Sequence, residues 1–186
     1  MSTPARGGPQ KTIADWLAAP DDARLELIDG ELVEKAAPTF DHGSAQSLTV
    51  AAVAGAFHRR AGGPGGPGGW WIATEVDIVL DGRGYRPDIL GWRRDRVPTP
   101  PKDRPVAVRP DWICEIVSVT KLRRYHQAGV PHYWIVDQVE RTLTVHRHTP
   151  DGYLVSSRSA EHESVHAEPF EGIELHVSVL LGGDPA

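Results

Sequence analysis

The chain has 186 residues, 40% of them hydrophobic, which suits one globular domain with a sizeable core. Its formal net charge of −5 disfavours a protein that coats nucleic acid, because such a surface needs concentrated Lys and Arg. An enzyme that meets nucleic acid only in a cleft is not excluded. A single cysteine excludes a disulfide framework and a Cys-rich zinc cage. With no signal peptide and no apolar run near the roughly 20 residues of a membrane span, we expect a soluble, cytoplasmic protein.

The N-terminal part of the chain predicts a short helix and a hairpin. We expect residues 1–11 to be a disordered lead and residues 12–186 to form one domain. Residues 12–17 read as a short helix that Thr12 caps. In residues 24–33, R-L-E-L-I-D-G-E-L-V, charged and apolar side chains alternate on each side of Asp29-Gly30. This pattern predicts a tight β-hairpin.

A longer helix, a glycine-rich loop and two strands follow. Residues 42–60 carry apolar side chains at near-helical spacing, which predicts a helix. Residues 62–69, G-G-P-G-G-P-G-G, predict a flexible loop. Residues 70–80 and 85–92 read as a second strand pair around Asp81-Gly82.

The C-terminal half predicts a buried central strand. Residues 93–109 contain four prolines and many charges, which indicates a surface loop. Residues 111–117, D-W-I-C-E-I-V, are almost continuously apolar, as in a strand buried on both faces. A short basic helix (120–128) and strands at 132–136 and 143–147 follow, and the tail from residue 152 looks like an additional antiparallel layer. This order predicts an α/β fold with a mixed sheet flanked by helices.

Glu115 is the first candidate for chemistry, because a carboxylate inside W-I-C-E-I-V is costly to bury without compensation. An Arg or Lys partner, a raised pKa or a metal ion could supply that compensation. Asp88 directly follows Pro87, which cannot donate a ladder hydrogen bond and therefore marks an irregular strand edge. Two carboxylates from neighbouring strands make the oxygen site that Mg²⁺ or Mn²⁺ prefers.

Lys121 opens the helix that leaves the Glu115 strand. Its ammonium group could position an attacking water or neutralise charge on a phosphoryl group. The alternative is a solvated helix residue. Tyr125 lies four residues further on the same helical face.

Three segments carry a family resemblance: P-D-I-L (87–90), E-I-V-S (115–118) and K-L-R-R-Y-H-Q-A-G-V-P-H-Y-W-I-V-D (121–137). With L-E-L-I-D-G-E-L-V (25–33) and H-G-S (42–44), they resemble the Uma2 family. That family is a domain of unknown function within the PD-(D/E)XK superfamily of restriction-endonuclease-like nucleases. The resemblance covers about residues 13–181, and its run G-V-P-H-Y-W-I-V-D is specific.

The resemblance implies a metal-dependent endonuclease that uses Mg²⁺ or Mn²⁺ to hydrolyse DNA, often as a homodimer. It implies that Asp88, Glu115 and the backbone carbonyl of Ile116 are metal ligands. The superfamily's lysine two residues after the glutamate is replaced by Val117, and the resemblance implies that Lys121 takes its role. Members of the family also have a longer polar segment before this helix. Either it is deleted here or residues are missing between Ser118 and Val119, and the close fit on each side favours the second.

Weaker candidates surround this set. The family places a glutamate at the position of Glu31 in the same pocket, although a solvent-facing hairpin residue is an equal alternative. His42 could face the cleft as a proton carrier or phosphate contact, or could merely begin its helix. Asp111, Glu75 and Asp77 could also point at the cleft, and exposed strand residues are the simpler reading.

Three functions remain open at this point. The leading hypothesis is a nuclease in which metal-activated water attacks a DNA phosphodiester. The first rival is a catalytically inactive nuclease-fold module that binds nucleic acid or a protein partner, which the acidic charge and the missing E-x-K lysine favour. The second is a hydrolase of another phosphoester, for which no phosphate-binding motif is present.

Overall fold

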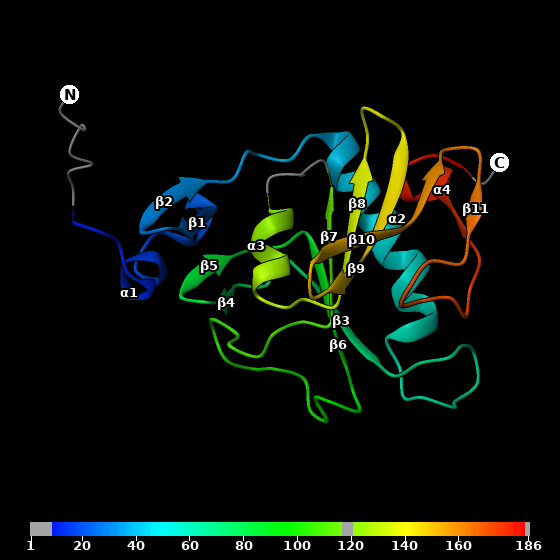
Figure 1. Ribbon diagram of the computed structural model, residues 1–186, viewed down its shortest axis with the longest axis horizontal. Helices are drawn as coiled ribbons and strands as arrows, with labels where there is room; N and C mark the ends of the chain where they lie inside the picture. The colour runs from blue at the N-terminus through cyan, green and yellow to red at the C-terminus, as the bar shows by residue number, and fades with distance from the viewer. Residues whose placement is uncertain (1–8, 117–120, 185–186) are drawn as a thin grey trace.

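A six-stranded mixed sheet forms the centre of the computed structural model, which describes residues 9–116 and 121–184 (Figure 1). Its strand order is β10-β9-β8-β7-β6-β3. The strands are β3 (Trp70–Thr74), β6 (Ile89–Arg93), β7 (Trp112–Ile116), β8 (His132–Asp137), β9 (Thr142–Thr149) and β10 (Gly152–Ala160). All pairs are antiparallel except β7 with β8. The predicted mixed sheet and its central strand are therefore confirmed.

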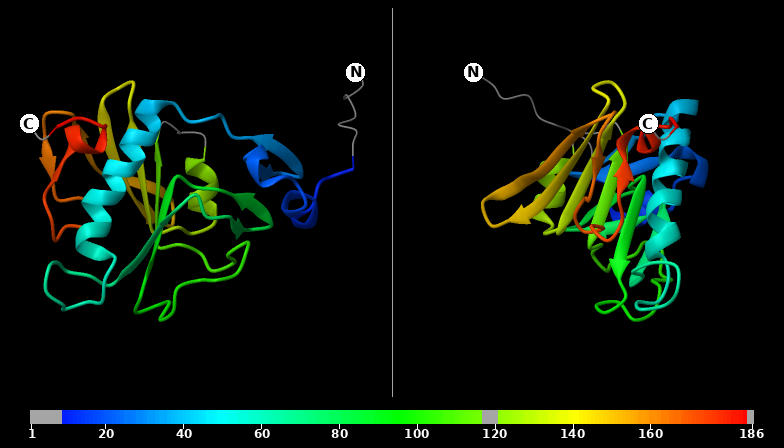
Figure 2. Two further views of the ribbon diagram at one scale, coloured as in Figure 1. Left: turned by 180° about the vertical axis from the view of Figure 1, so that it is seen from behind. Right: turned by 90° about the vertical axis from the view of Figure 1, so that its right-hand side faces the viewer.

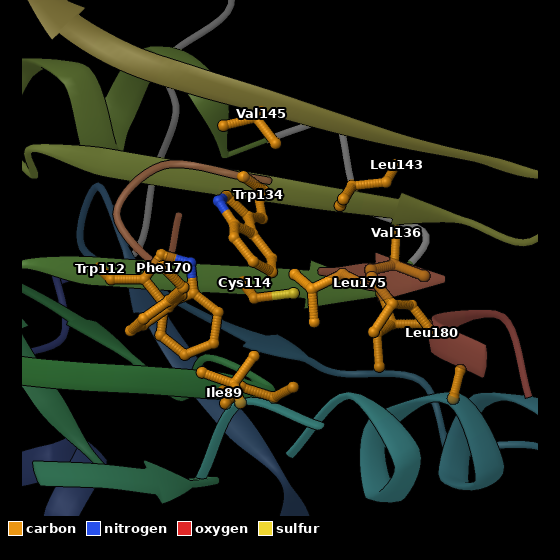
Figure 3. Close-up of a cluster of buried hydrophobic side chains, with 14 of the residues drawn as sticks. Ile89, Trp112, Cys114, Trp134, Val136, Leu143, Val145, Phe170, Leu175 and Leu180 are labelled. Atoms are coloured by element: carbon orange, nitrogen blue, oxygen red, sulfur yellow. The ribbon is translucent and has the colours of Figure 1, made fainter. Parts of the chain in front are cut away.

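Helices cover both faces of this sheet. The helix α2 (Phe40–Phe57) crosses one face and α3 (Leu122–Gln127) lies on the other (Figure 2). Along β7, Trp112 and Cys114 point to the α2 face, where they pack with Trp134 and Phe170 (Figure 3). Alternation along β7 therefore turns Glu115 to the opposite, α3 face.

Two hairpins make a second, smaller antiparallel sheet with the order β2-β1-β5-β4. Its strands are β1 (Leu25–Ile28), β2 (Glu31–Glu34), β4 (Ile78–Leu80) and β5 (Arg83–Tyr85). Both turns have positive φ at each central residue, 52° and 81° at Asp29-Gly30 and 49° and 73° at Asp81-Gly82. This is the geometry that the Asp-Gly pairs predicted.

The strands predicted at 70–80 and 85–92 do not form one simple pair. Each is divided, so that β3 pairs with β6 in the main sheet while β4 pairs with β5 in the small one. Glu75 has a left-handed φ of 53° directly after β3. This residue ends one ladder and redirects the chain into the other, and the alternating pattern gave no sign of that break.

The two ends of the described chain add short elements. The predicted first helix is present as α1 (Ile13–Leu17), and Thr12 and Asp15 form a capping box around its start. The 3-10 helix η1 (Asp21–Ala23) follows it. The tail supplies β10, the two-stranded sheet of β11 (Ser164–Val165) and β12 (Leu175–His176), and the unpredicted helix α4 (Val177–Leu180), which packs against α2. Within the described ranges, no helix is long and apolar enough to cross a membrane.

Candidate metal and phosphodiester site

The site begins where β6 meets β7. Ile89 pairs with Cys114, and the same antiparallel register continued by one residue sets Asp88 opposite Glu115. The backbone N–H of Ile116 donates to Asp88 Oδ2 at 2.7 Å, which fixes the carboxylate at the end of the ladder. The two carboxylates thus come from adjacent strands and face the same side of the sheet.

Asp88 is only 1% exposed and is held by a lysine, a histidine and a backbone N–H. Lys35 Nζ donates to its Oδ1 at 2.6 Å, and His42 Nε2 lies 3.4 Å from the same oxygen. Burial by itself would raise the pKa of Asp88. The contacts with His42, Lys35 and the Ile116 N–H outweigh burial and hold that pKa well below its usual range, so Asp88 is ionised.

Glu115 is equally buried, at 1% exposed, but its charge is less well compensated. The hydroxyl of Tyr125 donates to Glu115 Oε1 at 2.7 Å, and Lys121 Nζ lies 3.1 Å from the same atom. Burial raises the pKa of Glu115 to about 7, although the charge of Lys121 opposes that shift, and the nearby charge of Asp88 adds to it. In the metal-free protein this carboxyl therefore titrates near neutral pH.

Lys121 joins the main sheet to the first hairpin. Its ammonium group donates to Glu26 Oε1 at 2.7 Å as well as to Glu115. The side chain is nearly buried, which would lower its pKa, but the charges of Glu115 and Glu26 raise the pKa above its ordinary value. Lys121 therefore remains protonated and reaches the carboxylate, while the junction between Ser118 and Val119 lies outside the described residues.

A second lysine, which the sequence did not suggest, completes the cationic side of the site. Lys35 follows β2 directly, and its Nζ also donates to the Arg86 carbonyl at 2.9 Å and lies 3.4 Å from Glu75 Oε1. Gln46, four residues after His42 on α2, donates to the Asp88 carbonyl at 2.7 Å. The helical spacing from His42 was the only sequence signal that could have found Gln46, and no local pattern points to Lys35.

These side chains surround one cavity of about 860 Å³. Its lining includes Glu26, Lys35, His42, Asp88, Glu115 and Lys121. Ile116 also lines it, whereas Tyr125 is fully buried beneath Glu115. Acidic and basic side chains both line the cavity. This composition is typical of a site for a charged ligand rather than an apolar one.

The sequence model of the family described as "Uma2: Putative restriction endonuclease" matches residues 12–178. The chain belongs to the Uma2 family. A crystal structure described as that of "a putative nuclease belonging to DUF820 from Anabaena variabilis ATCC 29413" superposes with a TM-score of 0.71. It shares 20% sequence identity over 91% of this chain and 97% of that chain, so the likeness shows the shared fold. No curated protein matches the chain.

Not every residue expected in the Uma2 site lies there. Glu31 is exposed on β2 and does not line the cavity. Glu26 on β1 is 6% exposed and lines it instead. The reason is that β1 lies inside the small sheet, between β2 and β5, whereas β2 is its edge strand.

Two other acidic candidates belong to structural ion pairs elsewhere. Asp111 accepts from Arg96 Nε at 2.7 Å and from the Arg93 N–H at 2.8 Å. Asp77 accepts from Arg86 Nε at 2.7 Å. Neither aspartate lines the cavity.

The donor set can be tested against a divalent ion. Among the described residues, no group of three or more His, Cys, Asp and Glu is placed to hold a metal. Asp88 and Glu115 nevertheless present two carboxylates to one cavity, and Mg²⁺ is commonly bound by one or two carboxylates together with water and substrate phosphate. Burial, together with the nearby charge of Asp88, raises the pKa of Glu115, and a cation in the cavity would favour its ionised form. Asp88 and Glu115 would therefore suit a hard divalent ion as ligands.

Proposed function

We propose that this Uma2 protein is an endonuclease that hydrolyses DNA phosphodiester bonds with the help of Mg²⁺ or Mn²⁺. The observation that carries the proposal is the pair Asp88 and Glu115, both 1% exposed and both facing a cavity of about 860 Å³. Membership of a family described as "Putative restriction endonuclease" supports a nuclease-like function. A cavity of this size admits a phosphodiester and its neighbouring sugars.

Asp88 and Glu115 are the proposed ligands of the ion, with the carbonyl of Ile116 beside them. When bound, the ion supplies Lewis-acid stabilisation of the charge that develops on the phosphoryl group. Asp88 enters this role already ionised, because Lys35, His42 and a backbone N–H hold its pKa low. Glu115 is oriented by Tyr125, whose hydroxyl fixes one carboxylate oxygen at 2.7 Å.

Lys121 is the proposed cationic residue of the reaction. Glu26 and Glu115 keep it protonated and hold its ammonium group at the cavity. A fixed positive charge there stabilises the extra negative charge of the phosphoryl group as water adds to phosphorus and a P–O bond of the strand breaks. His42, whose Nε2 lies 3.4 Å from Asp88, lines the same cavity and is the proposed carrier of the proton that the water releases.

One observation favours the rival, a metal-free module without catalysis. Lys35 already pairs with Asp88 and Lys121 with Glu115, so each buried carboxylate has a cation without a metal. A binding module of this kind would keep both ion pairs when it meets nucleic acid or a protein. The two functions are therefore distinguished by whether a divalent ion enters the site.

The decisive experiment combines metal binding with DNA cleavage. Calorimetric titration with Mn²⁺ is expected to give binding in the wild type that Glu115→Gln and Asp88→Asn abolish. Supercoiled plasmid with Mg²⁺ is expected to be cleaved by the wild type and not by Glu115→Gln or Asp88→Asn. Glu31→Gln, which removes an exposed carboxylate of the same size outside the cavity, is the matched control. Cleavage that persists in Asp88→Asn, or wild-type protein that binds no Mn²⁺, would contradict the proposal.

We also propose that the protein acts as a homodimer. The support is β10, the edge strand of the main sheet, which exposes Leu154 (48%) and Val155 (51%). A long edge strand with exposed apolar side chains is a template for pairing with another chain. Light scattering of the wild type against Val155→Lys tests this, and a monomeric wild type would contradict it.

A further inference from the structure

A second cavity, of about 610 Å³, lies at the far end of β3 and β6 from the Asp88 site. Trp70 and Trp71 at the start of β3 line one side of it, and Arg93 and Arg94 at the end of β6 line another. Arg60, after α2, contributes a third arginine. This grouping of arginine and tryptophan is separate from the ion pairs of the first site, and Trp70 also belongs to the hydrophobic core.

Two of the three arginines lack a carboxylate partner within the part of the chain that the structure describes. Arg93 pairs with Asp95 at 2.9 Å on the exposed rim. Neither Arg60 nor Arg94 forms an ion pair with a described carboxylate. Arg94 is half-buried, and both burial and the charge of Arg60 lower its pKa. Two neighbouring cations without an anion form a local positive field in an otherwise acidic protein.

Arg94 is also held rigidly in place. Its guanidinium lies 3.4 Å from the centre of the Trp71 ring, and its Nε donates to the Trp70 carbonyl at 2.9 Å. Trp71 is itself fixed, because its indole N–H donates to the Val97 carbonyl at 3.0 Å. A guanidinium whose plane is already fixed loses little conformational entropy when its remaining N–H groups bind a phosphate.

We propose that this second cavity binds the phosphate groups of a nucleic-acid strand, with Arg94 and Arg60 as the contacting residues. The inference rests on the proposed function, since it takes a nucleic acid as the substrate. Asp88 precedes β6 and Arg94 follows it, six residues on, which at about 3.3 Å per residue is roughly 20 Å. A nucleic-acid strand advances about 3.4 Å per nucleotide, so this straight-line separation equals about six nucleotides. Because β6 is buried from Ile89 to Trp92, a strand that contacts both sites runs around the sheet and spans more than six.

The test measures DNA binding without metal, so that cleavage plays no part. Fluorescence anisotropy in EDTA follows a labelled duplex of about two helical turns, about 20 base pairs, binding to the wild type and its variants. Arg60→Gln, an exposed position, and Arg94→Gln remove the proposed contacts, and Arg158→Gln removes an exposed arginine on β10 as a charge-matched control. Each cavity variant is expected to weaken binding about tenfold and to reduce the salt slope by about one. Arg158→Gln is expected to bind as the wild type does.

The outcomes separate the two proposals. If neither Arg60→Gln nor Arg94→Gln weakens DNA binding, the proposal that the second cavity binds phosphates is wrong. The proposed function of the Asp88 site is not affected by that result. If the wild type binds DNA neither in EDTA nor with Ca²⁺, the phosphate-binding proposal and the proposed nuclease function are both wrong. Arg60 is exposed, so Arg60→Gln keeps the test valid if Arg94→Gln fails to fold. Inorganic phosphate that displaces the duplex at equal concentration of phosphate groups would show a free-anion site and would also overturn the inference.

Discussion

Lys35 Nζ lies 2.6 Å from Asp88 Oδ1, so the residue after the first hairpin supplies the counter-ion for the carboxylate before β6. Fifty-three residues separate the two in the chain. A divalent ion bound to Asp88 would place its positive charge beside the same carboxylate as the ammonium group of Lys35. Lys35 and the ion therefore compete for one carboxylate, and that competition can be measured.

Lys35→Met is expected to destabilise the metal-free protein and to tighten metal binding. Removing one partner of a buried ion pair costs about 3 kcal/mol in the free energy of unfolding. The unpaired Asp88 then attracts Mn²⁺ more strongly. Thermal melts and calorimetry with and without Mn²⁺ measure both effects, with exposed Lys102→Met as the control. Weaker Mn²⁺ binding in Lys35→Met would show that Lys35 supports the ion rather than competing with it.

The pH dependence of stability depends on Glu115. Its folded pKa of about 7 lies above its ordinary 4.5, so it contributes stability below pH 4.5 and loses it as pH rises to about 7. At about 1.4 kcal/mol per pH unit, the metal-free wild type should lose about 3 kcal/mol over this window. Asp88, whose pKa is lowered, acts in the opposite direction and only at acid pH.

Urea melts in EDTA between pH 4.5 and 7.5 test this directly. Glu115→Gln should flatten the profile across that window, because an amide does not titrate. A wild-type profile that is already flat would mean that Lys121 and Tyr125 compensate the charge of Glu115 fully. Glu31→Gln, on the exposed edge strand, should leave the wild-type profile unchanged.

Tyr125→Phe tests how Glu115 is oriented. The ring packs against Tyr85 and Tyr133, with ring centroids at 5.3 Å in each case, and Phe keeps that packing. The change removes only the hydroxyl that donates to Glu115 at 2.7 Å. We expect a loss of about 1–3 kcal/mol in stability at neutral pH and weaker Mn²⁺ binding. Tyr153→Phe, whose hydroxyl donates to a backbone carbonyl outside the site, is the control.

The residues of the candidate site that lie on or next to regular strands could be proposed from the sequence. Glu115 was recognisable because an otherwise apolar strand seldom contains an unpaired carboxylate, and β7 is buried on every residue. Asp88 was recognisable from the proline before it and from the family resemblance. Lys121 was proposed mainly from that resemblance, and it contacts Glu115 in the same cavity.

What could not be predicted depends on how the small sheet meets the large one. Glu26 and Glu31 are not paired across the hairpin, since Glu31 pairs with Ile28, but alternation places both on the same face. The position of β1 between β2 and β5 buries Glu26, and the edge position of β2 leaves Glu31 exposed. Lys35 reads as an ordinary charged residue after a strand. Its role depends on Asp88, a contact that no local pattern encodes.

Lys121→Met separates the proposed catalytic charge from metal binding. Lys121 is bonded to Glu26 and Glu115 and is not a ligand of the proposed ion, so its loss should leave Mn²⁺ affinity equal or higher. Loss of a fixed charge that stabilises a phosphoryl transition state typically costs about 100-fold or more in rate, and plasmid cleavage should fall by that much. Arg123→Met, an exposed change on the same helix, should cleave normally. Cleavage by Lys121→Met at the wild-type rate would show that the lysine has only a structural role, as the ion-pair partner of Glu26.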